Sequence, residues 1–222
     1  MRIRLEVVHG DALEYPADVL ALKFAQHLFG VDRAVVGRLE RKGVQVGSRL
    51  PAIGTALLLN SEHVIAAAEV LFVGVVPLGR FDYRTIREFA YSALASLSKK
   101  RPSIQHLAMT LHGVGFGLDE AEAFRAEVAG ILDAVAAGQR PDGLNRVSIV
   151  ERDAQGASRL KTLLDSILPA SIVDDNESRR DVEQASLDAA RGSLGAVGHD
   201  SRQKPHVFVA MPFAEEYADR FH

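Results

Sequence analysis

Residues 112–117 limit what this chain can fold into more than any other short segment, because three of these six residues are glycines, in the order His-Gly-Val-Gly-Phe-Gly. The apolar run 104–111 precedes them, and residues 119–124 begin a helical pattern after them. A strand that leads through a glycine-rich turn into a helix forms an anion pocket, because backbone N–H groups point into it. This order predicts a nucleotide-type ligand; the alternative is that the glycines only turn the chain.

Strand-like and helix-like segments alternate along residues 1–168. Apolar and β-branched runs predict strands that begin near Ile3, Asp18, Val70, Ile104 and Arg146. Apolar residues at helical spacing predict helices over residues 30–39, 86–97, 121–136 and 157–168. Residues 53–59 and 63–67 predict a hairpin around 60–62. The alternation predicts the α/β class, as a three-layer αβα domain with a mixed or largely parallel sheet.

The composition changes after Pro169, which predicts a domain boundary there. Residues 169–205 are charged or small and predict a linker, with one short helix near 179–191. Residues 206–213 read His-Val-Phe-Val-Ala-Met-Pro-Phe and predict a buried strand, after which 214–221 would begin a helix. These elements have no core of their own, so we expect 206–222 to begin a second α/β domain that is truncated at His222. The alternative is that this strand belongs to the first domain.

Composition excludes several classes of protein. A net charge of −3 with scattered basic residues gives no reason to expect a nucleic-acid partner. The chain has no cysteine, hence no disulfide framework, which fits a cytoplasmic location. No apolar stretch reaches the roughly 18–20 residues that span a bilayer, so we expect no membrane partner. The first residues predict a strand and not a signal peptide.

Five short segments occur in an order typical of one family. They are Gly-Asp-Ala at 10–12 with the buried run 17–22, Gly-Val-Asp at 30–32, Leu-Pro-Ala-Ile-Gly-Thr-Ala at 50–56, Val-Gly-Val-Val-Pro at 73–77, and the glycine loop 113–117. In this order, residues 1–168 resemble a macro domain, the αβα module that binds ADP-ribose. The same residues are similar to the N-terminal domain of leucyl aminopeptidases, which shares the fold and serves assembly. That alternative implies a protein-interaction or oligomerisation module.

The macro-domain resemblance implies a ligand site made of two glycine loops and one aspartate. Asp11, beside Ala12, would accept a hydrogen bond from an adenine amino group, or else it only makes a turn. Gly30, Val31 and Asp32 would offer backbone N–H groups to a diphosphate, with the Asp32 side chain capping its helix. The second phosphate loop would comprise Gly113, Val114, Gly115, Phe116 and Gly117, with Phe116 packed on a ribose or adenine ring or in the core.

The resemblance also argues against turnover. Catalytic macro domains carry an asparagine after the second strand, where residues 23–27 here read Lys-Phe-Ala-Gln-His. His27 and His112 flank the expected pocket, but the histidines do not have the spacing of a metal site. We therefore predict no catalytic residue, no metal and no cofactor, and binding of the ligand without reaction.

Residues 206–221 resemble the opening of a TIR-like, nucleoside-deoxyribosyltransferase-like domain, whose catalytic glutamate would lie beyond His222. Macro domains that accompany TIR-like domains occur in bacterial anti-phage systems, where they sense a nucleotide signal made from NAD. The two resemblances together imply a sensor that binds an ADP-ribose-like or other NAD-derived nucleotide and regulates a TIR-like effector. A homo-oligomer is compatible with the sensor and with the interaction module.

Overall fold

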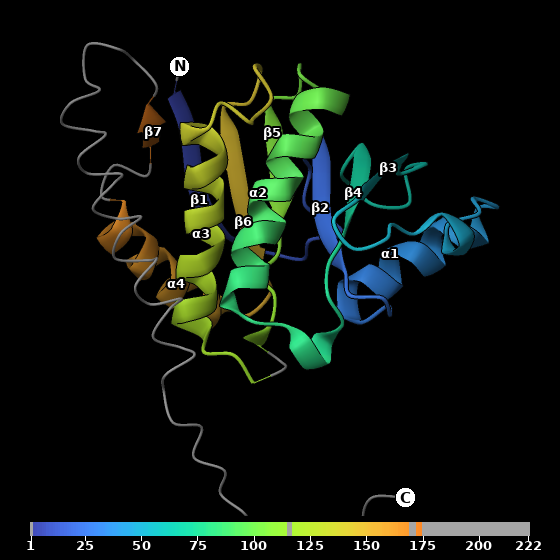
Figure 1. Ribbon diagram of the computed structural model, residues 1–222, viewed down its shortest axis with the longest axis horizontal. Coiled ribbons are helices and arrows are strands. Elements are labelled where there is room, and N and C mark those ends of the chain that lie inside the picture. Colours follow the sequence, from blue (N-terminus) through green and yellow to red (C-terminus); the bar gives the residue numbers. More distant parts are fainter. Residues whose placement is uncertain (1, 115–116, 169–171, 175–222) are drawn as a thin grey trace, which may run out of the picture.

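The computed structural model describes residues 2–114, 117–168 and 172–174. In this part the strands form one mixed sheet of seven, in the order β3-β4-β2-β5-β6-β1-β7 (Figure 1). The five inner strands are parallel, and the edge strands β3 and β7 are antiparallel to their neighbours. The strands are β1 (Arg2–His9), β2 (Val19–Phe24), β3 (Ala56–Asn60), β4 (Glu69–Gly74), β5 (His106–Met109), β6 (Arg146–Glu151) and β7 (Ile172–Asp174).

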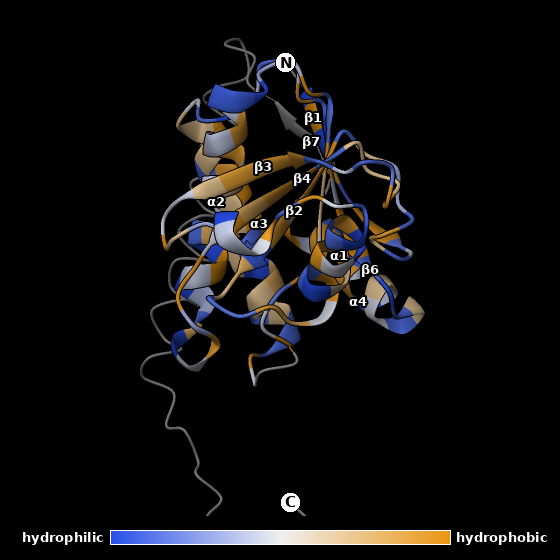
Figure 2. Cartoon of the chain, turned by 90° about the vertical axis from the view of Figure 1, so that its right-hand side faces the viewer, coloured by the Kyte–Doolittle hydropathy of each residue, from blue (hydrophilic) through white to orange (hydrophobic). Residues whose placement is uncertain are grey.

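The helices cover the sheet in two layers. α2 and α3 lie side by side over one face, and α1 packs on the other (Figures 1 and 2). The close approach of α2 and α3 depends on Gly130, where a Cβ would overlap the carbonyl group of Arg87. The helices are α1 (Gly30–Arg41), α2 (Tyr83–Lys100), α3 (Glu120–Ala136) and α4 (Ala154–Ile167), with short 3-10 turns at Gly47–Arg49 and Leu78–Arg80.

Strand β2 shows why this sequence builds a covered sheet. Five of its six residues are buried, as expected for a parallel strand with a layer on each face. Leu20 and Leu22 belong to the apolar cluster under α1, whereas Val19 and Ala21 belong to the cluster under α2 and α3. Figure 2 shows β2, β3 and β4 as mainly hydrophobic ribbons between helices of mixed character.

The structure confirms the predicted αβα class and places all five predicted strands in one sheet. The predicted hairpin between residues 53–59 and 63–67 is wrong: β3 pairs with β4, and residues 61–68 form the turn between them. Glu62 and His63 have left-handed φ angles of 51° and 58°, and the Ser61 amide donates to the Ala68 carbonyl over 2.9 Å. Residues with positive φ cannot continue a strand, so the reversal comes before residue 69.

Beyond residue 168, the structure describes only β7. Its three residues fall inside the predicted linker and pair with Arg2–Arg4 of β1. The predicted helix near 179–191 and the predicted strand in 206–213 lie outside the described residues. In the described ranges, no helix is both long enough and apolar enough to cross a membrane.

A buried carboxyl group in α3 costs stability. Glu127 is 0% exposed, and neither carboxyl oxygen has a hydrogen-bond partner in the described part of the chain. Burial raises the pKa of Glu127 well above its usual range. We expect Glu127→Leu to increase the free energy of unfolding at pH 7 by roughly 1–3 kcal/mol, because it removes an unsatisfied polar group.

The pH dependence provides the control for Glu127. A raised pKa in the folded state means that stability is highest below the unfolded pKa, near 4.5, and falls as pH rises toward the folded pKa. Glu127→Gln cannot ionise, so the gap between this variant and the wild type should widen from pH 4 to pH 8. Urea unfolding across that range measures it, and a constant gap would contradict the assignment.

Candidate functional site

Four loops at the carboxyl ends of parallel strands enclose a cleft of about 600 Å³. They follow β1, β2, β5 and β6, and such loops meet because parallel strands end at the same edge of a sheet. The cleft is lined by Gly10, Asp11, Ala12, Leu13, Lys23, Phe29, Gly30, Val31, Asp32, Ala34, Thr110, Leu111, His112, Gly113, Val114, Val150, Glu151 and Arg152.

Asp11 makes a turn and also faces the cleft. Its Oδ1 accepts a hydrogen bond from the Leu13 amide over 2.9 Å, which is the turn predicted as the alternative role. The Gly10 amide donates to the Glu151 carbonyl over 2.9 Å and ties this loop to the end of β6. The turn uses one carboxylate oxygen, so it is compatible with a second hydrogen bond from Asp11 to a ligand.

The N-terminus of α1 opens into the cleft without a side-chain cap. The N-cap residue is Phe29, whose side chain offers no hydrogen-bond acceptor and whose carbonyl accepts from the Asp32 amide over 3.2 Å, and Gly30 follows with a left-handed φ of 52°. Gly30, Val31 and Asp32 of the first turn line the cleft. A helix N-terminus has N–H groups without intrahelical partners and a partial positive charge, so it favours an anion.

Asp32 does not cap α1, contrary to the sequence-based expectation. Its Oδ2 accepts a hydrogen bond from Lys23 Nζ at 2.9 Å, and the two side chains are 0% and 6% exposed. Burial raises the pKa of Asp32, while the charge and hydrogen bond of Lys23 oppose this effect. Asp32 Oδ1 is buried and has no partner among the described residues. The floor of the cleft is therefore a buried ion pair with one free acceptor.

His112 is the second buried polar group beside this floor. The residue is 4% exposed, and its ring packs edge-on against Phe89 with centroids 4.8 Å apart. Burial, with a smaller contribution from the charge of Lys23, lowers the pKa of His112 well below its usual range, so the imidazole is neutral at pH 7. Its Nε2 has no hydrogen-bond partner in the described ranges. His27, the other histidine expected near the pocket, is exposed and does not line the cleft.

The second glycine loop is described only in part. Gly113 has a left-handed φ of 92°, which favours glycine, and a Cβ there would also lie 2.6 Å from Leu118 Cδ1. Gly113 and Val114 line the cleft, whereas Gly117 is described but does not line it. Gly115 and Phe116 lie outside the described residues. Seven of the ten predicted residues therefore line the same cleft: Asp11, Ala12, Gly30, Val31, Asp32, Gly113 and Val114. Their role in binding remains a prediction.

Sequence reasoning missed Lys23 and two charged residues, Glu151 at the end of β6 and Arg152 directly after it. Lys23 interrupts an otherwise apolar strand, and an aspartate follows nine residues later in the first turn of a helix. A charged residue in a buried strand needs a partner, and this was the signal that could have found the pair. Arg152 adds a second cation to the lining, beside Glu151.

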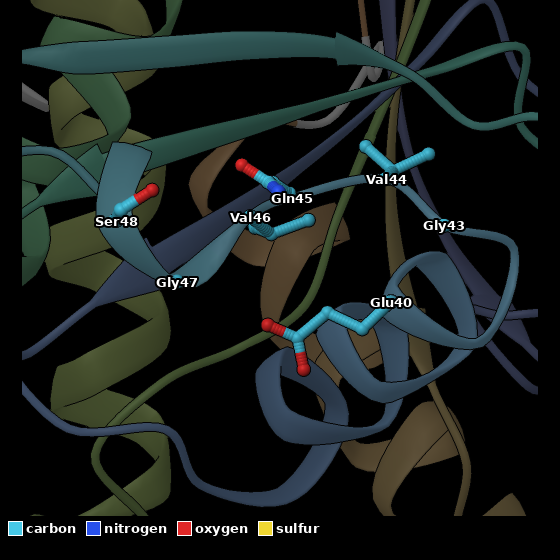
Figure 3. A pocket seen from close by; sticks show the side chains of 7 residues that line it. All are labelled: Glu40, Gly43, Val44, Gln45, Val46, Gly47 and Ser48. Atoms are coloured by element: carbon cyan, nitrogen blue, oxygen red, sulfur yellow. The ribbon is translucent and has the colours of Figure 1, made fainter.

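A second hollow lies at the other end of α1 (Figure 3). Glu40 and residues 43–48 line it, and Glu40 is the one charged side chain among them. A carboxylate without a cation does not fit an anionic ligand, so this hollow is a weaker candidate than the cleft. Within the described ranges, no three His, Asp or Glu side chains gather into a group that could hold a metal ion.

The solved structures similar to this chain include macrodomains. A variant of the Oceanobacillus iheyensis macrodomain has a TM-score of 0.57 and 13% identity, over 77% of this chain and 99% of that one. A second variant of that macrodomain, solved with ADPR, has a TM-score of 0.57 and 15% identity, over 76% of this chain and 100% of that one. The Trypanosoma brucei macrodomain in complex with ADP has a TM-score of 0.56 and 13% identity, over 72% of this chain and 69% of that one.

No family model and no curated protein sequence matches the chain. At 13–15% identity the similarity shows the fold, and the fold is that of a macrodomain.

The ion pair at the floor of the cleft can be tested by breaking it from one side. We expect Lys23→Met to lower the free energy of unfolding by about 3–5 kcal/mol, because it leaves the Asp32 carboxylate buried without a cation. The double variant Lys23→Met with Asp32→Leu should recover most of that loss. Urea unfolding measures both.

The exposed pair Arg84–Glu88 on α2 is the control, with side chains 69% and 60% exposed. Arg84→Met should cause no measurable change, because solvent screens such a pair. Equal losses for Lys23→Met and for the double variant would contradict the explanation that the loss comes from an unpaired Asp32 carboxylate.

Proposed function

We propose that this macrodomain-fold chain binds a nucleoside diphosphate of the ADP-ribose type in the cleft and does not turn it over. The observation that carries the proposal is the N-terminus of α1, which has no side-chain cap and whose first turn lines the cleft together with Gly113 and Val114. Backbone N–H groups at a helix start are suited to phosphate oxygens. Arg152 at the rim adds a positive charge for the same ligand.

The expected pose follows from the order of the loops around the cleft. The diphosphate would lie between the first turn of α1 and the Gly113 loop. Asp11, on the neighbouring loop, would accept a hydrogen bond from the amino group of the base. The Oceanobacillus iheyensis and Trypanosoma brucei macrodomains were solved with ADPR and with ADP, which supports a ligand of this chemical class.

The side chains of the cleft favour binding over reaction. No serine or cysteine is among its described lining residues, and the lining residues Lys23 and Asp32 are paired with each other. The asparagine of catalytic macro domains is replaced in residues 23–27. Gln26, the one carboxamide in that segment, has a φ of 64° and donates from Nε2 to the Val75 carbonyl over 3.2 Å. Gln26 does not line the cleft, so its carboxamide is not placed to act on a ligand there.

Titration calorimetry with ADP-ribose, ADP, NAD and cyclic ADP-ribose tests the proposal. We expect ADP-ribose to bind, and we expect Val31→Glu to weaken it at least about tenfold, because a carboxylate at the helix start repels the diphosphate. The matched control is Val44→Glu: both valines are partly buried against the same apolar cluster, but Val44 lines the hollow of Figure 3.

Two results would count against nucleotide binding. Equal losses for the two valine variants would mean that they act through stability rather than through charge in the cleft. No heat with any of the four nucleotides would favour the interaction module, which sedimentation analysis of the oligomeric state would then test.

We further propose that ligand binding regulates a TIR-like effector, as in the bacterial anti-phage systems that combine the two folds. The support is the resemblance of residues 206–221 to the start of such a domain. In a chain that carries a complete TIR-like domain, ADP-ribose should change the rate of NAD cleavage. The resemblance places the catalytic glutamate of that family beyond residue 222, so residues 1–222 alone should cleave no NAD.

A further inference from the structure

A second polar cluster lies under the loop that carries Asp11, and its centre is the Ser148 hydroxyl group. Ser148 is 0% exposed, and its Oγ lies 2.8 Å from Glu6 Oε1, 2.8 Å from His106 Nε2 and 3.1 Å from the Tyr15 hydroxyl. Glu6, His106 and Ser148 belong to β1, β5 and β6. Tyr15 comes from the loop between β1 and β2, and we call these four residues the Ser148 network.

Hydrogen-bond capacity fixes the direction of each bond in the Ser148 network. A carboxylate can only accept, so the Ser148 hydroxyl donates its one proton to Glu6. Ser148 Oγ then accepts from the Tyr15 hydroxyl and from the Nε2–H of His106. The hydroxyl group reaches its full capacity of one donated and two accepted bonds.

This direction excludes a hydrolytic role for the Ser–His contact. A nucleophilic serine gives its proton to the histidine, whereas here the histidine donates to the serine. Ser148 is also completely buried and does not line the cleft. The Ser148 network therefore has a structural role, which involves the loop that contains Tyr15.

Tyr15 and Asp11 belong to one short loop between the end of β1 and the start of β2. Backbone bonds fasten this loop through the Gly10 amide at its start and the Leu13 and Ala17 carbonyls farther along. The side chain of Tyr15 adds a bond from the loop into the sheet, and its ring packs edge-on against His106 at 5.6 Å. The loop thus connects the sheet interior with the wall of the cleft.

We infer that the Ser148 network positions the Asp11 loop for recognition of the base, with Tyr15 as the positioning residue. Apolar side chains could fill the same space, so we assign this buried polar network a role in geometry and not in stability. The expected effect on nucleotide affinity rests on the proposed function. The order of the loop itself depends on the network whether or not a nucleotide binds.

Tyr15→Phe tests the inference because it removes one hydroxyl group and keeps the ring against His106. In the free protein, we expect hydrogen exchange at the Leu13 amide, which is bonded to Asp11 Oδ1, to become faster. We also expect the dissociation constant for ADP-ribose to rise about three- to tenfold, the effect of one hydrogen bond. On an Asp11→Ala background the same change should add nothing.

The control is Tyr91→Phe on the outer side of α2, away from the cleft, which should leave exchange and binding unchanged. Unchanged exchange at Leu13 in Tyr15→Phe overturns the inference. Faster exchange together with an unchanged dissociation constant shows that the loop is held but not for binding, and this also overturns it. If the wild type does not bind ADP-ribose, the proposed function fails, and the exchange measurement alone decides whether the network holds the loop.

Discussion

The geometry of the cleft depends on the buried ion pair between Lys23 and Asp32. Lys23 is near the end of β2 and Asp32 is in the first turn of α1, so their 2.9 Å contact joins the strand to the helix that follows it. The connection between them includes two left-handed residues, Gln26 and Gly30. A buried pair contributes little net stability compared with apolar side chains. The pair instead orients α1, because it keeps the first turn of this helix at the cleft.

The polar atoms that burial leaves unsatisfied in the described residues fall into two groups with different meanings. Asp32 and His112 line the cleft, and their unsatisfied atoms, Oδ1 and Nε2, are buried behind its surface. Glu127 lies inside the helical layer, where its two carboxyl oxygens meet only protein. Each of these groups therefore costs desolvation energy, but only Asp32 and His112 carry that cost next to the cleft.

The sequence predicted the elements that local periodicity specifies, and it missed the contacts between residues far apart in the chain. The inner strands and the helices follow from apolar runs of period 2 or 3.6 and from glycine turns, and the loops of the cleft follow from their order. The predicted partner of β3 was wrong because two left-handed residues, Glu62 and His63, place the chain reversal before β4. The Ser148 network was not predictable, since Glu6 and Ser148 are 142 residues apart and meet only when β1 pairs with β6.

The short pairing of β7 with β1 has a mechanical consequence. The chain passes through β7 before it continues toward residue 222, so any pull from that side reaches the sheet through this ladder. Three residues of β7 face β1, whereas six residues of β6 do so on the other side. The shorter ladder between β7 and β1 therefore breaks before the ladder between β6 and β1, and β7 separates from the sheet. The strands that carry the cleft loops stay paired, so the wall of the cleft is shielded from force on the chain beyond it.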